Sequence, residues 1–226
     1  MAQSGFFITF EGPDGAGKST QVKLLLDYLA AIEPVYIREP GGTELGEKVR
    51  SLLLDGKGEL DSYAEMYLFF AARAQGIKEL IDPALHAGKV VVADRYHDST
   101  IAYQGAGSGI EVPWPDSFPK PDLTFLLSIP AEEGLFRALR AKKGGKDRME
   151  SKDLDFHRRV SSRYQAMAQE EPERFVEIDA RLGKEEIQAK IRNAVEGLIG
   201  VMAPEEGDLA ALPSTEAAEE ATMEVS

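Results

Sequence analysis

One short segment near the N-terminus constrains the fold of this chain more than any other. The sequence EGPDGAGKST at residues 11–20 satisfies the pattern G-x-x-x-x-G-K-[ST], with Gly12, Gly17, Lys18 and Ser19 at the specified positions. An apolar run precedes it and a helical pattern follows it. Such a loop wraps a polyphosphate because its backbone N–H groups point inward and the following helix adds its positive dipole end. We therefore predict a phosphate-binding loop between a buried strand and a helix.

The side chains of this loop have expected roles in binding ATP. Lys18 can reach the β- and γ-phosphates, and the Ser19 hydroxyl can coordinate Mg²⁺, a hard ion that prefers oxygen ligands. The glycines let the backbone come close to the phosphates. The predicted ATP-binding residues of the loop are Gly12, Pro13, Asp14, Gly15, Ala16, Gly17, Lys18, Ser19 and Thr20.

Outside the loop, the chain alternates between short apolar runs and segments of helical periodicity. Directly after the loop, for example, Val22, Leu25, Leu26 and Leu29 recur at the spacing of one helix face. Strands that alternate with helices in this way form a parallel sheet covered by helices. We therefore predict an α/β fold of three layers with a five-stranded parallel sheet, its strands at residues 6–10, 34–37, 89–93, 123–129 and 174–178.

Composition and charge exclude several classes of protein. Hydrophobic residues make up 43% of the chain, enough for one domain with a sizeable core, yet no stretch approaches the roughly 20 apolar residues that span a bilayer. The formal net charge of −13 argues against a nucleic-acid groove, which needs clustered positive charge. The absence of cysteine excludes a disulfide framework and fits a reducing compartment. We expect a cytoplasmic protein that binds neither nucleic acid nor membrane.

The acidity is concentrated at the C-terminus. Residues 201–226 contain seven acidic residues, no Lys or Arg, and many small residues. This composition offers too little apolar surface to offset the entropy lost on ordering. We therefore expect one domain over residues 1–200 and a disordered tail over residues 201–226, with a protein-binding tail as the less favoured alternative.

A second chemical cluster follows the third predicted strand, in KVVVADRYHDSTIAYQG at residues 89–105. Asp94 ends the strand where a phosphate-loop protein needs a carboxylate near its metal ion, so Ser19 and Asp94 are the predicted metal ligands. Arg95 follows directly, and a planar guanidinium at the carboxyl end of a central strand suits phosphate recognition. A structural ion pair with Asp94 or Glu11 is the alternative for Arg95.

Several motifs together make the sequence resemble the thymidylate kinases. After the phosphate loop come REPGGT at residues 38–43, LFFAARAQ at 68–75 and DRYHDSTIAYQG at 94–105, with a looser match in DRME at 147–150. The matches follow in the expected order and cover about residues 5–200. The resemblance implies the P-loop kinase fold, direct in-line transfer of the γ-phosphoryl group of MgATP to dTMP, and a homodimer.

The resemblance also implies roles at the acceptor site. Phe69 is expected to stack on the thymine ring, and Arg73, one helical turn on, to donate to a base carbonyl. One of the two adjacent rings Phe69 and Phe70 is expected to be ordinary core. Arg38 and Arg95 are expected to bind the acceptor phosphate.

The segment after Arg95 is expected to complete the acceptor site. Ser99 and Gln104 would hydrogen-bond the base edge, and Tyr103 would pack under the sugar where a 2′-hydroxyl would otherwise lie. Asp14 resembles the family carboxylate that meets the sugar 3′-hydroxyl and the positioned phosphate, with a loop-capping Asp as the alternative. The predicted substrate-binding residues are Arg38, Phe69, Arg73, Arg95, Ser99, Tyr103 and Gln104.

Phosphoryl transfer needs cations beyond Lys18 and Mg²⁺ to neutralise the transferred group. One branch of the family carries a basic residue inside the phosphate loop, where this sequence has Gly15. The basic stretch RALRAKKGGKDR at residues 137–148 instead resembles the lid of the bacterial type, which we place at about residues 141–149. The candidate lid cations are Arg140, Lys143 and Arg148, with a solvated helix end as the alternative for the first two. The predicted catalytic residues are Lys18, Arg95, Arg148 and Asp14.

Two features depart from the family pattern. The stretch between Gln104 and Pro121 is shorter than family members commonly have, and four prolines between residues 113 and 121 argue against a helix there. Ser128 stands where relatives often have an acidic residue. Two alternative functions stay open: a kinase for another monophosphate or a broader set, and a nucleotide-binding switch without transfer activity.

Overall fold

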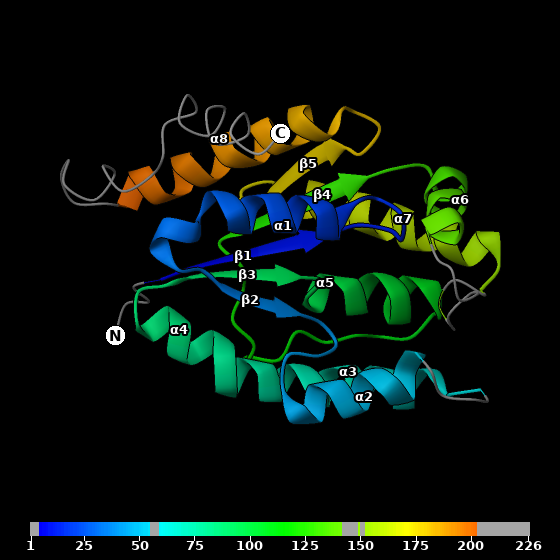
Figure 1. Ribbon diagram of the computed structural model, residues 1–226. Coiled ribbons are helices and arrows are strands. Elements are labelled where there is room, and N and C mark those ends of the chain that lie inside the picture. The colour runs from blue at the N-terminus through cyan, green and yellow to red at the C-terminus, as the bar shows by residue number, and fades with distance from the viewer. Residues whose placement is uncertain (1–4, 55–58, 142–148, 150–151, 203–226) are drawn as a thin grey trace.

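The computed structural model describes residues 5–54, 59–141, 149 and 152–202, so residues 203–226 of the predicted tail and most of the predicted lid lie outside the described residues. Its centre is a sheet of five parallel strands in the order β2-β3-β1-β4-β5 (Figure 1). The strands are β1 (Phe6–Glu11), β2 (Val35–Arg38), β3 (Val90–Asp94), β4 (Leu123–Ser128) and β5 (Phe175–Asp179). Each bound lies within one residue of its predicted range, and the predicted parallel sheet is confirmed.

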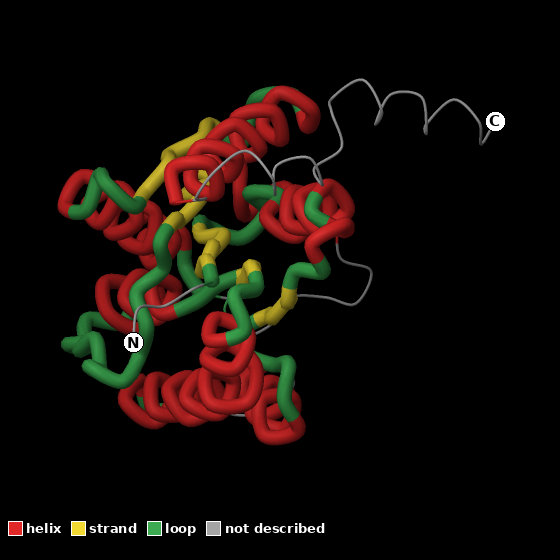
Figure 2. The backbone as a smooth tube through the Cα atoms, turned by 90° about the vertical axis from the view of Figure 1, so that its left-hand side faces the viewer, coloured by secondary structure: helices red, strands yellow, loops and turns green. Residues whose placement is uncertain are grey.

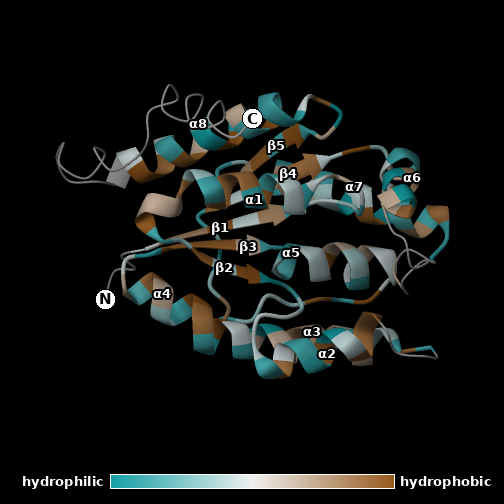
Figure 3. Ribbon diagram, viewed as in Figure 1, coloured by the Kyte–Doolittle hydropathy of each residue, from teal (hydrophilic) through white to brown (hydrophobic). Residues whose placement is uncertain are grey.

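Helices cover both faces of the sheet, which produces the three predicted layers (Figures 1 and 2). On one face, α1 (Lys18–Tyr28) and α8 (Lys184–Met202) pack their apolar residues against β1, β3 and β4. The other face carries α3 (Ser62–Gly76), α4 (Asp82–His86) and α7 (Leu154–Glu170). Every residue of β3 is buried, as a strand covered on both faces requires, and hydrophobic residues dominate the strands in Figure 3.

Shorter elements connect these layers. They are the 3₁₀ turn η1 (Ala30–Ile32), α2 (Glu44–Leu54), the π-helical segments η2 (Ile77–Ile81) and η3 (Ile101–Gly107), α5 (His97–Thr100) and α6 (Ala131–Ala141). The proline-rich stretch before β4 forms no helix, as predicted. Trp114 anchors it, because its ring meets His97 edge-on and its Nε1 donates to the Phe118 carbonyl at 2.9 Å. In the described part of the chain, we find no helix with the length and hydropathy to cross a membrane.

The register of the sheet brings distant motifs together. Phe10 of β1 pairs with Asp94 of β3, and Asp94 pairs on its other side with Arg38 of β2. The carboxyl ends of these three neighbouring strands therefore meet at one edge, where open α/β sheets bind ligands. This edge carries the phosphate loop, Arg95 and the start of REPGGT.

Candidate active site

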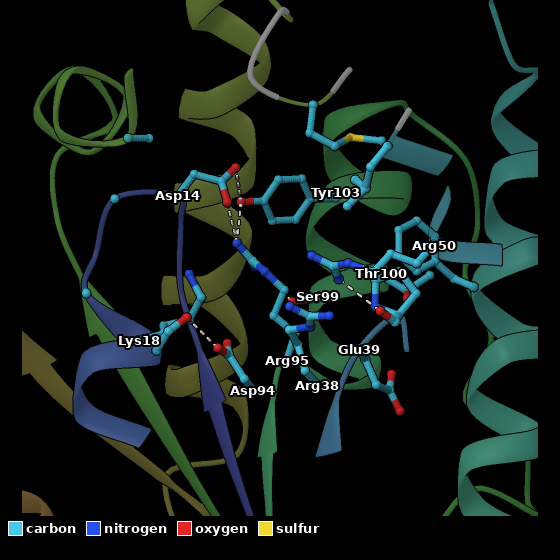
Figure 4. Close-up of a pocket in the computed structure, with 18 of the residues that line it drawn as sticks. Asp14, Lys18, Arg38, Glu39, Arg50, Asp94, Arg95, Ser99, Thr100 and Tyr103 are labelled. Atoms are coloured by element: carbon cyan, nitrogen blue, oxygen red, sulfur yellow. Dashed lines mark hydrogen bonds and ion pairs between the residues drawn. The ribbon is translucent and has the colours of Figure 1, made fainter. Parts of the chain in front are cut away.

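A cavity of about 540 Å³ opens at this edge of the sheet. Thirteen of the predicted residues line it, although they come from segments far apart in the sequence. They are Asp14, Gly15, Gly17, Lys18, Ser19, Thr20, Arg38, Phe69, Asp94, Arg95, Ser99, Tyr103 and Gln104. Figure 4 shows the central members of this set around Arg95. The tertiary fold thus gathers most of the predicted donor and acceptor residues around one space.

The phosphate loop wraps around the Lys18 ammonium. Lys18 Nζ donates to the carbonyl oxygens of Gly12 at 2.9 Å and Pro13 at 2.8 Å, and its side chain is buried. Burial and the nearby charge of Arg95 lower the pKa of Lys18 to about 8. A bound anion is therefore favoured here, because phosphate oxygens would compensate for the hydration that the ammonium lost on burial.

The loop leaves no room for a side chain at its middle. Gly15 has φ 76°, and a Cβ atom there would collide with the Gly134 carbonyl oxygen of α6 and lie 2.9 Å from the backbone nitrogen of Ala138. Gly134 in turn has the Asp14 carbonyl 2.7 Å from its own Cβ position. A basic residue at position 15 is thus incompatible with this packing of α6 against the loop.

Two oxygen donors fit a magnesium ion beside the loop. Ser19 Oγ donates to Asp94 Oδ2 at 2.6 Å, and both residues line the cavity. A hydroxyl and a carboxylate at the foot of a phosphate site are donors that Mg²⁺ accepts, since it commonly takes its other ligands from water and phosphate oxygens. The two predicted residues therefore lie together beside the phosphate loop.

Arg95 lies at the centre of the site in a strained backbone conformation. Its φ is 70°, a left-handed value that a residue with a side chain seldom adopts, and its N–H donates to the Phe10 carbonyl at 3.0 Å. Its guanidinium donates from NH2 to Asp14 Oδ1 at 2.5 Å and from NH1 to the Gly12 carbonyl at 3.1 Å. Strain of this kind is typical of functional positions.

The ion pair of Arg95 is with Asp14, and not with Asp94 or Glu11 as the structural alternative proposed. Burial alone would raise the pKa of Asp14, but the charges of Arg95 and Lys18 outweigh burial and hold this pKa below its usual value. Tyr103 completes the group, because its hydroxyl donates to Asp14 Oδ2 at 2.9 Å and its ring lies beneath the guanidinium, 5.0 Å from ring centroid to Cζ. Figure 4 shows this trio, with Arg95 reaching toward Asp14 and Tyr103.

The two predicted base-edge residues of the segment 94–105, Ser99 and Gln104, already form hydrogen bonds with other side chains. The Ser99 hydroxyl donates to Glu11 Oε2 at 2.6 Å and accepts from Arg95 NH1 at 3.1 Å. Gln104 Nε2 donates to Glu65 Oε1 at 2.7 Å. Both residues line the cavity while most of their surface is buried.

The helix α3 carries the predicted base-binding residues. Phe69 lines the cavity, whereas Phe70 packs on the rings of His97 and Phe118, so the prediction that one ring is core is confirmed. Arg73 does not line the cavity, because its side chain is buried and the residue is only 2% exposed.

Arg73 forms a buried cluster with Glu39, which itself lines the cavity. Its Nε donates to Glu39 Oε2 at 2.7 Å, its NH2 donates to the Tyr96 carbonyl at 3.0 Å, and NH1 lies 3.1 Å from His97 Nδ1. Burial raises the pKa of Glu39 although the Arg73 charge opposes this shift. In this structure the cluster braces the strand end that carries Glu39 against the segment that carries Arg95.

The lid candidates are placed only in part. Lys143 and Arg148 lie outside the described residues. Arg140 is exposed near the end of α6, its Cζ 5.5 Å from the Phe136 ring centroid, and it does not line the cavity. Arg137, one turn earlier on the same helix, does line it.

The chain matches known proteins over most of its length. A family model described as thymidylate kinase matches residues 10–191. The chain belongs to the thymidylate kinase family. It is 48% identical to a thymidylate kinase of Desulfovibrio desulfuricans, over 85% of this chain and 96% of that one, and 44% identical to one of Deinococcus radiodurans, over 84% and 96%. The crystal structure of thymidylate kinase from Ehrlichia chaffeensis superposes with a TM-score of 0.68 at 33% identity, covering 85% of this chain and 99% of that one.

These matches confirm the predicted family and the P-loop kinase fold, and they identify the chain as a member of a family of ATP-dependent nucleoside monophosphate kinases. They also cover the segment where the chain departs from the expected length. The phosphate loop, Asp94 and Arg95 all fall inside the region matched by the thymidylate kinase model.

Sequence reasoning missed three charged residues of the cavity of this thymidylate kinase family member. Glu39 and Arg50 line it beside Arg38, and Arg137 lines it from α6. Arg50 NH1 donates to the Pro40 carbonyl at 2.9 Å, so the helix after REPGGT turns back onto that motif. Glu39 lies inside REPGGT, so the sequence could have predicted it as a cavity residue. Nothing in the neighbouring sequence indicates that Arg50 and Arg137 reach the cavity, because only the packing of α2 and α6 decides which side of each helix faces it.

Proposed function

We propose that this protein transfers the γ-phosphoryl group of MgATP onto dTMP, producing ADP and dTDP for dTTP synthesis. The observation that carries the proposal is one cavity of about 540 Å³ that joins the phosphate loop to Arg95 and to the Phe69 ring. A donor phosphate and an acceptor phosphate can be positioned together there among cationic side chains, and position and charge stabilisation are the main requirements of phosphoryl transfer. Membership of the thymidylate kinase family supports the same activity.

The proposed chemistry is a direct in-line displacement. An oxygen of the dTMP phosphate attacks the γ-phosphorus of ATP while the bond from that phosphorus to the β,γ-bridging oxygen breaks, and ADP leaves with this oxygen. The attacking oxygen is already anionic, so no general base is required. The protein contributes position and charge, with Lys18 on the donor and Arg95 and Arg38 on the acceptor.

Ser19 and Asp94 are the proposed holders of Mg²⁺, which when bound neutralises charge on the ATP phosphates. The 2.6 Å hydrogen bond between them supports this assignment because it aligns both oxygens on the cavity side of the loop. Their part is to fix the ion relative to Lys18, so that donor and acceptor stay in line.

The remaining acceptor residues divide by what they touch. Phe69 is the proposed platform for thymine and Tyr103 the proposed neighbour of the deoxyribose, with Asp14 near its 3′-hydroxyl. Gln104 is the proposed contact of the base edge. The Ser99 hydroxyl, predicted to share that task, lies in the hydrogen-bond network behind Arg95.

Arg73 stays the proposed donor to a thymine carbonyl. Its contacts with Glu39, His97 and Tyr96 engage three of its five N–H groups among the described residues, which leaves two for a ligand. A small rearrangement on dTMP binding would be needed, because the side chain is buried. Arg148, Lys143 and Arg140 stay the proposed lid cations, and Arg137 joins them because it already lines the cavity.

We also propose a cytoplasmic homodimer. Four large apolar side chains are exposed on neighbouring helices: Leu45 and Leu52 on α2, and Tyr63 and Tyr67 on α3. Exposed apolar surface that gathers on packed helices is typical of protein contact sites, and a second copy would cover it. Light scattering that reports a monomer at micromolar concentration would contradict this part of the proposal.

The substrate is tested by an ADP-release assay with MgATP and each of dTMP, dUMP, AMP, CMP and GMP. We expect dTMP to have the highest kcat/KM. A different best acceptor would contradict the substrate, while retaining the kinase. Tight MgATP binding without turnover of any monophosphate would instead identify a nucleotide-binding switch.

A further inference from the structure

Behind Arg95, on the side away from the cavity, lies a buried carboxyl group that the reaction does not touch. Glu11 ends β1 directly before the phosphate loop, and its exposed fraction is 0%. It faces Arg95, Asp98 and Ser99 from the β3–α5 segment, Lys18 from α1 and Tyr164 from α7. Burial and the charge of Asp98 raise the pKa of Glu11 to about 7.

Three hydrogen-bond donors converge on this carboxylate. The backbone N–H of Tyr96 donates to Glu11 Oε1 at 2.7 Å. The hydroxyls of Ser99 and Tyr164 donate to Oε2 at 2.6 and 2.9 Å. Charged acceptors that collect several such donors hold them in fixed directions.

The two hydroxyls on Glu11 also accept from Arg95. Arg95 NH1 donates to Ser99 Oγ at 3.1 Å and to the Tyr164 hydroxyl at 3.4 Å. A hydroxyl has one hydrogen, and above its pKa of about 7 Glu11 is a carboxylate, which can only accept. The two hydroxyl oxygens also lie 2.8 Å apart, and either can donate to the other. Each hydroxyl hydrogen therefore points to Glu11 or to the neighbouring hydroxyl, and both oxygens present lone pairs to the guanidinium. The side chain of Arg95 is thereby fixed from behind, while Asp14 holds it in front.

We propose that Glu11 is a positioning residue for phosphoryl transfer, which acts through the Ser99 and Tyr164 hydroxyls to aim Arg95 at the acceptor phosphate. This inference deepens the proposed function and rests on it for the identity of the acceptor. It makes the last residue of β1 part of the acceptor side of the site, although the donor loop begins one residue later.

The variant Glu11→Gln tests the direction of these hydrogen bonds with almost no change of shape. The Tyr96 N–H requires an acceptor, so the amide oxygen would face it and the NH₂ group would face the two hydroxyls. Their hydrogens would then turn toward Arg95. We expect kcat/KM for dTMP to fall about 10-fold, the size of one charge-assisted hydrogen bond, and KM for MgATP to change by no more than about 3-fold.

A double-mutant cycle separates positioning from general stabilisation. If Glu11 acts through Arg95, Glu11→Gln should cost nothing further in an Arg95→Ala background, in kcat/KM for dTMP or in the calorimetric Kd of dTMP measured without ATP. Equal losses toward both substrates, or independent losses in the cycle, would overturn the proposal. Tyr164→Phe removes one of the two linking hydroxyls and should produce a smaller loss of the same kind. It replaces Glu11→Gln in the cycle if that variant does not fold.

Thr9→Val is the matched structural control. Thr9 lies two residues earlier on β1, is fully buried, and shares a 2.9 Å hydrogen bond with Thr124 away from the cavity. It should lower the melting temperature and leave both kinetic constants within about 2-fold. A wild-type protein that binds dTMP without turnover would end the proposed function but leave the calorimetric cycle to decide on Glu11. A wild-type protein that does not bind dTMP would overturn both.

Discussion

The donor side and the acceptor side of the cavity are built in different ways. The donor side is almost entirely one contiguous segment, in which the loop backbone encloses Lys18 and Ser19 lies one residue on. The acceptor side collects Arg38, Phe69, Arg95 and Tyr103 from three separate segments. Its central cation, Arg95, is held in place by Asp14, and by Glu11 through the Ser99 and Tyr164 hydroxyls.

This difference follows from the shapes of the two ligands' binding groups. A chain of phosphates can be bound by backbone N–H groups and a helix terminus, which one loop supplies. Discrimination between one monophosphate and another needs side chains directed at a base, a sugar and a phosphate at once. Long side chains lose much entropy when they are ordered, so a site that orders them in advance binds its ligand at lower cost.

The largest expected effect comes from removing the charge at the centre of the acceptor side. Arg95→Ala should lower kcat/KM for dTMP by about 10²–10³-fold, because a cation is lost where charge is transferred. Binding of MgATP, measured by calorimetry, should change only a few-fold if the two sides are as separate as the geometry indicates. A comparable loss of ATP affinity would show that the two sides form one unit.

The variant Arg73→Met should have a free energy of unfolding about 3 kcal/mol lower than the wild type, because Glu39 is left buried without its cation. The measurement is urea denaturation followed by circular dichroism. Arg38→Met is the matched control, since that arginine is half-exposed and lies 3.8 Å from Glu47, and it should change stability by less than about 0.5 kcal/mol. Equally small changes in the free energy of unfolding for both variants would show that Arg73 does not brace this part of the fold.

Gly15→Ala tests the contact between the donor loop and α6. The added Cβ collides with the Gly134 carbonyl at a positive φ, so we expect a loss of about 2 kcal/mol and a higher KM for MgATP. At Gly17 φ is 87°, and apart from its chain neighbours no atom of the described residues lies within 4 Å of an added Cβ. Gly17→Ala should therefore lose only the conformational cost, about 1 kcal/mol. Equal losses of stability in the two variants would mean that α6 moves away from the added methyl group at no cost in free energy.

The pH dependence of ATP use should report Lys18. Its folded pKa of about 8 lies below its ordinary value of 10.5, so the free enzyme loses this charge above about pH 8. We expect kcat/KM for MgATP to fall by up to about 10-fold per pH unit there, since this ratio reports the free enzyme. The stability contribution of Lys18 should instead rise between pH 8 and 10.5, because the folded state binds fewer protons than the unfolded state in this window. A fall that persists in Lys18→Arg would assign it to another group.

Much of the fold was predictable because its signals are local. The five strands were placed within a residue of their observed ends, since a buried parallel strand is a continuous apolar run that stops where polar residues begin. Phe69 and Arg95 were likewise found at the cavity, because each belongs to a compact motif. Arg140 and Arg137 show the limit, since both fit a basic helix end and only the second lines the cavity.

The sequence by itself determined that the chain has a phosphate loop, a parallel sheet and an arginine at a strand end, because each is written in neighbouring residues. Only the tertiary structure decided what each charge is paired with. Arg95 pairs with Asp14, Arg73 with Glu39, and Glu11 lies behind Arg95 with Ser99 and Tyr164. The physical reason is that burial, which gives such pairs their effect on pKa and geometry, depends on segments more than 30 residues apart meeting at one edge of the sheet.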